Sequence, residues 1–151
     1  MISLRLRPDD LSGGTSWRLV HWALETGSDE FTFSCLGTSP DARFCMTAEA
    51  ALAAFVIEDA PRPRLSRPPD EGWVRDVHLW RLDEESLAVL RRLLPEGIFT
   101  DHQGSTDGWI EDLTFYEGRQ IRLGVITHEH EAALNLSESE HVLLREMQVL
   151  R

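Results

Sequence analysis

The sequence predicts an α+β fold, in which a mixed, mainly antiparallel sheet of about six to eight strands carries three packed helices. Two observations support this prediction. Segments with the alternating apolar and polar pattern of strands come in runs, and segments with helical patterns interrupt those runs one at a time. The chain of 151 residues also has the length of one domain, so a single α+β domain is expected over residues 1–151.

The first half of the chain has the patterns of three strands and one helix. Apolar residues alternate with polar ones over residues 2–7, which indicates the first strand. Further strands are expected near residues 16–24 and over 31–35, and these two are expected to pair as a hairpin. An alanine-rich helix is predicted over 48–57, with Thr47 as its N-cap.

A segment rich in proline and arginine, residues 61–69, separates the two halves. Its prolines cannot continue a helix or a central strand, so an extended connector is expected there. A spacer across the surface is the first interpretation, and a proline-rich ligand for another protein is the alternative.

The second half begins with a predicted strand over 73–81 and a helix capped by Asp83 and stopped at Pro95. A capping box, Ser137 with Glu140, then marks the start of the last helix. Four strands are predicted between these helices, over residues 98–100, 108–116, 119–127 and 131–136. The apolar residues expected to pack the last helix onto the sheet are Val142, Leu143, Met147 and Leu150.

Two segments share a pattern without gaps. Residues 72–80 and 108–116 both read G-W-[VI]-x-D-[VL]-x-[LF]-[WY]. An internal duplication would explain the match, and so would two strands that meet similar packing demands.

Composition indicates a cytoplasmic protein. Cys35 and Cys45 lie beside apolar residues and have no metal-binding or disulfide-rich spacing, so buried free thiols are expected. The sequence has no signal-peptide pattern and no apolar run long enough for a membrane helix. All 15 basic residues are arginine, a bias typical of a GC-rich bacterial genome.

The net charge of −11 bears on function. Residues 96–141 hold ten acidic residues and two arginines, an excess of eight negative charges. Such a surface repels nucleic acid and favours a basic protein partner, although solubility alone would also explain it. The candidate interaction residues are Asp107, Glu111, Asp112, Glu129 and Glu131.

Histidines and acids in the same region indicate a second type of site. If residues 128–131 are extended, His128 and His130 point to the same side with Cα atoms roughly 6.6 Å apart, and two imidazoles can then bind one cation. If the strands predicted over 98–100, 108–116 and 119–127 form an antiparallel meander, His102 and Asp101 lie at the same edge of the sheet, where either would supply a third ligand to a zinc or manganese site. The alternatives are a solvated polar turn and a pH-sensitive contact.

Two functions follow from these observations. The preferred hypothesis is a non-catalytic protein-binding domain, immunity-like or regulatory, because the charge is concentrated and no complete catalytic motif occurs. The alternative is a metal-dependent hydrolase or oxygenase with its site around residues 101–107 and 128–131. A homodimer, for example through a strand edge, remains open.

Overall fold

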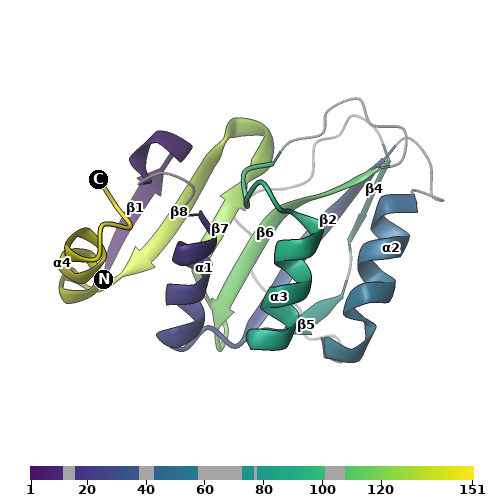
Figure 1. The fold of residues 1–151 in the computed structure, drawn as a ribbon, viewed down its shortest axis with the longest axis horizontal. Coiled ribbons are helices and arrows are strands. Elements are labelled where there is room, and N and C mark those ends of the chain that lie inside the picture. Colours follow the sequence, from purple (N-terminus) through teal and green to yellow (C-terminus); the bar gives the residue numbers. More distant parts are fainter. Residues whose placement is uncertain (12–15, 38–42, 58–72, 77, 101–107) are drawn as a thin grey trace.

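In the computed structural model, residues 1–11, 16–37, 43–57, 73–76, 78–100 and 108–151 are described, and they form an α+β domain built on one sheet (Figure 1). Every pairing between the described strands is antiparallel. The predicted fold class is therefore confirmed. The described helices number four rather than the expected three.

The sheet has eight strands in the order β1-β8-β7-β6-β2-β5-β3, and β4 also pairs with β2. The strands are β1 (Ile2–Leu6), β2 (Glu30–Gly37), β3 (Val56–Ile57), β4 (Trp73–Asp76), β5 (Leu79–Arg81), β6 (Trp109–Glu117), β7 (Gln120–Ile126) and β8 (Glu131–Leu136). The helices are α1 (Ser16–Glu25), α2 (Arg43–Leu52), α3 (Glu84–Leu93) and α4 (Glu138–Glu146), with three short 3-10 helices, η1 (Pro8–Asp10), η2 (Ala53–Phe55) and η3 (Thr127–Glu129).

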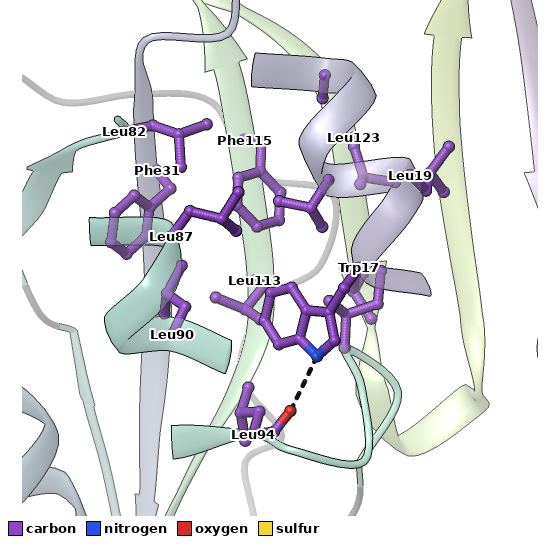
Figure 2. Packing of buried hydrophobic residues seen from close by; sticks show 14 of the residues in the cluster. Trp17, Leu19, Phe31, Leu82, Leu87, Leu90, Leu94, Leu113, Phe115 and Leu123 are labelled. Carbon is purple, nitrogen blue, oxygen red and sulfur yellow. Dashed lines mark hydrogen bonds between the residues drawn. The ribbon is translucent and has the colours of Figure 1, made fainter. Parts of the chain in front are cut away.

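The main hydrophobic core lies between the sheet and the helices α1 and α3. Figure 2 shows Phe31, Phe115 and Leu123 of the sheet packed against side chains from both helices. Trp17 of α1 is buried, and its indole N–H donates to the carbonyl oxygen of Leu94 at 3.0 Å, which ties α1 to the end of α3.

The segment near residues 16–24 is the helix α1, so the strand and the hairpin expected there are wrong. Trp17 and Leu19 start an alternation, but Val20 breaks it. The buried positions of α1 recur at the spacing of one helix face, and they are Trp17, Leu19, Val20, Trp22 and Ala23.

Two strand predictions also need correction. Residues 98–100 form a turn rather than a strand, in which the amide of Thr100 donates to the carbonyl oxygen of Gly97. The predicted strand over 73–81 is divided into β4 and β5. The middle strand of the predicted meander, β6, therefore has β2 as its first neighbour and β7 as its second.

Helix α2 begins five residues earlier than predicted. Thr47 lies inside it, and its hydroxyl donates to the carbonyl oxygen of Arg43 rather than capping an N-terminus. The helix ends at Leu52, where η2 follows. The predicted connector at 61–69 lies outside the described residues.

Several local predictions are confirmed. Asp83 caps α3, and Ser137 with Glu140 forms the capping box of α4. Cys35 and Cys45 are free and buried. Among the described residues, no helix has the length and apolar character needed to cross a membrane.

Helix α4 does not bury the residues expected to face the sheet. Leu144 is fully buried, whereas Val142, Leu143 and Met147 are exposed. Leu150 is buried beyond the end of the helix, where it pairs with Leu11. The prediction is correct for Leu150 and wrong for the other three residues.

The two segments with the shared G-W pattern lie on opposite sides of β2. Trp109 pairs with Leu36, and Trp73 pairs with Gly37. Farther along, Trp80 and Phe115 both lie opposite Phe31 of β2, although the alignment matches Trp80 with Tyr116. The matched residues thus differ by one position in register, which fits similar packing demands on two sides of one strand.

Candidate functional site

The first candidate site is a β-bulge in β6. The register between β2 and β6 shifts between Thr32 and Ser34, where β6 carries one residue more than its partner. Asp112 occupies the bulge with a φ of 54°. Aspartate is one of the few residues that tolerate this left-handed conformation. The bulge breaks the strict alternation of the strand, which would otherwise direct Glu111 and Asp112 to opposite faces.

Hydrogen bonds fix Asp112 to the connection between β7 and β8. Its carboxylate accepts from the amide of Thr127 at 2.9 Å, and its own amide donates to the Thr127 hydroxyl at 2.9 Å. Thr127 begins η3, and His130 ends that turn with a φ of 52°. The bulge thereby holds the turn that carries His128.

The resulting group, called here the bulge site, consists of Glu111, Asp112 and His128. Their potential ligand atoms all lie within 4.8 Å of one another. Glu111 and Asp112 are 4% and 7% exposed, while His128 is exposed. Two carboxylates and one imidazole are a ligand set that suits zinc or manganese.

The predicted metal ligands occupy different positions from those expected. Residues 128–130 form the turn η3 and its end rather than an extended strand, so the expected same-side arrangement of His128 and His130 is wrong. Within the described residues, the group at the bulge contains His128 but not His130. Asp101 and His102 lie outside the described residues.

The residues predicted to bind a partner lie in different places in the structure. Glu111 and Asp112 belong to the bulge site, and Glu129 is exposed with its carboxylate 3.8 Å from the His128 imidazole. Glu131 is buried and binds Arg7 at 2.9 Å, an interaction that raises the pKa of Arg7. Asp107 lies outside the described residues. An interaction role for this set stays a prediction.

A second feature lies at the other end of β6 and was not predicted. The end of α1, the start of β2, the start of α3 and the end of β6 come together along the lower edge of the sheet in Figure 1. They bring together seven acidic residues, called here the acidic edge: Glu25, Asp29, Glu30, Asp83, Glu84, Glu85 and Glu117.

Contacts join the acidic edge into one surface. His21 of α1 lies 3.3 Å from Glu25 and 3.6 Å from Glu84, so it links α1 to α3. The carboxylate of Asp29 accepts from the amide of Gly118, next to Glu117. The amide of Leu82, next to Asp83, donates to the carbonyl oxygen of Asp29 at 2.8 Å and joins the two pairs, so acids from four elements lie near one another.

Among the described residues, Arg81 and Arg122 form ion pairs with these acids, and Arg119 lies in the turn that follows Glu117. Arg81 binds Asp83 at 2.7 Å. Arg122 lies 3.3 Å from Glu117, but it also binds Glu140. The amide of Ser86 and the Arg81 guanidinium lower the pKa of Asp83, which keeps that carboxylate charged.

The carboxylates of the acidic edge are accessible as well as numerous. The side chains of Glu84, Glu25 and Glu117 are 72%, 58% and 53% exposed. Most of these acids lie outside residues 96–141, where the sequence shows its charge excess. The one local signal for them was the Asp83-Glu84-Glu85 run at the start of α3.

Comparisons of this chain with protein families, with characterised proteins and with solved structures find no match.

Proposed function

We propose that the protein is a non-catalytic binding domain of the cytoplasm, immunity-like or regulatory, that binds a basic protein partner through the acidic edge. The observation that carries this proposal is the gathering of seven acidic residues from α1, β2, α3 and β6 on one surface, with Arg81 and Arg122 as the arginines in contact with it. Such a surface attracts positive charge and accelerates association with a basic partner.

Rigid elements hold the edge in place, which favours recognition over simple solubility. Glu84 and Glu85 project from the first turn of a capped helix, and Asp29 is fixed by the amide of Gly118. Carboxylates held by backbone structure lose little freedom on binding, so charge complementarity can contribute to specificity.

The test is capture of the partner from an extract of the natural host cells at low salt, with the purified protein as bait. The variant Glu25→Arg/Glu84→Arg reverses two exposed charges of the edge. The matched control Asp9→Arg/Glu96→Arg reverses two exposed acids elsewhere. Wild type and control should retain the same basic protein, and the edge variant should lose it.

A second candidate function rests on the bulge site. The carboxylates of Glu111 and Asp112 are almost fully buried, so a small ion fits them better than an arginine or lysine of a partner. Zinc or manganese bound by Glu111, Asp112 and His128 would keep open positions at which water is activated, as in a hydrolase or oxygenase. This is the metal-dependent alternative, with a ligand set that differs from the one expected.

A metal titration of tag-free protein tests this second candidate. Wild type should bind one equivalent of zinc or manganese, and His128→Ala should lose that binding. Asp112→Asn provides a second variant, because asparagine tolerates the left-handed conformation and can still accept from the Thr127 amide. It should stay folded and bind metal at least tenfold more weakly. His141→Ala is the histidine control, and equal binding by all variants would rule out the site.

A further inference from the structure

His21 lies between two carboxylates of the acidic edge, where the end of α1 meets the start of α3 (Figure 1). Its Nε2 atom is 3.3 Å from Glu25, four residues later on α1, and its Nδ1 atom is 3.6 Å from Glu84 of α3. The His21 side chain is 45% exposed, and both glutamates are more exposed still. A bound partner can therefore reach all three side chains.

The charge of the imidazole decides how His21 meets these two acids. A neutral imidazole has one N–H, so its other nitrogen turns a lone pair towards a carboxylate. An imidazolium has an N–H on each nitrogen and attracts Glu25 and Glu84 at once. Histidine is the type of side chain whose charge changes between about pH 5 and about pH 8. A fall in pH across this range thus places a positive charge between two acids of the edge.

Other basic side chains around α1 have contacts elsewhere. Arg18, three residues before His21 on the same helix, donates to the carbonyl oxygen of Met147. Arg122 of β7 lies against the Trp22 ring and binds Glu140. These contacts direct both guanidinium groups away from Glu25 and Glu84.

The two helices themselves carry no other base at this place. The last turn of α1 has no basic residue, and Glu25 ends the helix, although the helix dipole favours positive charge there. On α3, Glu84 and Glu85 lie in the first turn, and Arg91 and Arg92 lie in the last. Within the described parts of the two helices, His21 is the base that contacts acids of both.

We propose that His21 competes with the basic partner for Glu25 and Glu84, and that protonation of His21 weakens partner binding as pH falls from about 8 to about 5.5. A guanidinium or ammonium group of the partner needs the same two carboxylates, and charged His21 both occupies them and repels it. Partner and proton therefore oppose each other's binding. This inference rests on the proposed function, because His21 regulates binding only if the acidic edge is the binding surface.

Fluorescence anisotropy with a labelled peptide of about nine arginines, at about pH 8 and about pH 5.5 in low salt, tests the proposal. Arginine keeps its charge across this range, so any change in affinity comes from the protein. One added charge about 5 Å from a bound cation at an exposed site changes affinity about three- to tenfold. Between the two pH values, wild type should lose that much more affinity than His21→Gln. The two proteins should bind alike at the higher pH.

Two further variants control for charge and for the other histidines. His21→Arg keeps a positive charge at both pH values and should bind the peptide more weakly than His21→Gln at each. His130→Asn removes an exposed histidine from the turn after β7, and asparagine tolerates the left-handed backbone there. Its affinity should change with pH as that of wild type does. Melting temperatures at both pH values check that every variant is folded.

The acidic edge is tested in the same assay at the higher pH. Glu25→Arg/Glu84→Arg should bind the peptide at least about tenfold more weakly than Asp9→Arg/Glu96→Arg, which has the same net charge. Equal binding by these two variants would overturn the acidic edge and the role of His21 together. If the two variants differ as expected but wild type and His21→Gln lose affinity equally on acidification, the role of His21 alone is overturned.

Discussion

Arg122 is a buried charged side chain with several hydrogen-bond partners. It is buried and donates to Glu140 at 2.7 Å, to the Thr26 hydroxyl and to the carbonyl oxygen of Asn135. Its guanidinium also lies 5.0 Å from the centre of the Trp22 ring. Removing one partner of a buried ion pair leaves an uncompensated charge, so this contact should matter for stability.

Glu140→Gln tests this contact. Arg122 and the capping box lower the pKa of Glu140 from 4.5 to about 2, so the carboxylate stabilises the fold above pH 4.5 and loses that contribution as pH falls towards 2. The glutamine variant should lose about 1–3 kcal/mol of unfolding free energy at pH 7, reduced from the full pKa shift because Glu140 is 24% exposed. Urea unfolding at pH 7 and at pH 3 measures the effect.

The pH dependence tests whether the charge of Glu140, shared by the ion pair and the capping box, carries the contribution to stability. Between pH 4.5 and 2, wild type should lose more stability than Glu140→Gln, so the two should converge. Glu146→Gln, an exposed acid of the same helix, should behave like wild type at both pH values. A constant difference between wild type and Glu140→Gln across this range would contradict a stabilising role of the Glu140 charge.

Asp112 shows what a sequence pattern cannot reveal at the residue scale. The strand over residues 108–116 was predicted correctly, and so was the turn after β7. The bulge depends on register with β2, a strand about 80 residues earlier in the chain. Without that register, strict alternation places Glu111 and Asp112 on opposite faces of the strand, and their approach to His128 cannot be inferred.

At the scale of elements, most helices and strands that have local start and stop signals were predicted from the sequence. Asp83 and Ser137 marked α3 and α4 correctly, and alternation marked β1 and β2. Helix α1 was missed because Trp17 and Leu19 imitate the start of a strand. In the sequence, Arg18 and His21 fall between the apolar residues of α1 and hide its helical period, although both lie outside the buried face of the helix.

The sequence predicted helix α4 but not which of its sides faces the sheet. Its apolar residues occupy more than one side of the helix, and the sequence does not indicate which side meets the sheet. The structure turns Leu144 inward and leaves the larger apolar surface in solvent.

Two alanine variants test this orientation. Leu144→Ala should cost about 2–4 kcal/mol, because it removes a fully buried side chain and leaves a cavity. Leu143→Ala should change stability by less than about 0.5 kcal/mol, because this side chain is 44% exposed. Chemical unfolding of both variants supplies the comparison. Equal losses, or a larger loss for Leu143→Ala, would contradict the orientation of α4.

At the scale of the whole molecule, topology decides where charge gathers. The sequence places the acidic excess in residues 96–141, but the most exposed acidic surface joins Glu25, Glu84 and Glu117 from three distant segments. The path of the chain brings the ends of α1 and β6 and the start of α3 to one edge of the sheet (Figure 1). The acidic edge and the bulge site lie near opposite ends of β6, so binding at each can be tested separately.

The measurement that tests the central claim most directly is partner capture by wild type and Glu25→Arg/Glu84→Arg, side by side, at about 50 mM and about 300 mM salt. We predict that wild type retains one basic protein at low salt, that salt releases it, and that the edge variant does not bind it while Asp9→Arg/Glu96→Arg does. Equal retention by wild type and the edge variant, or no protein enriched by wild type, would contradict the proposal that the acidic edge is a binding surface.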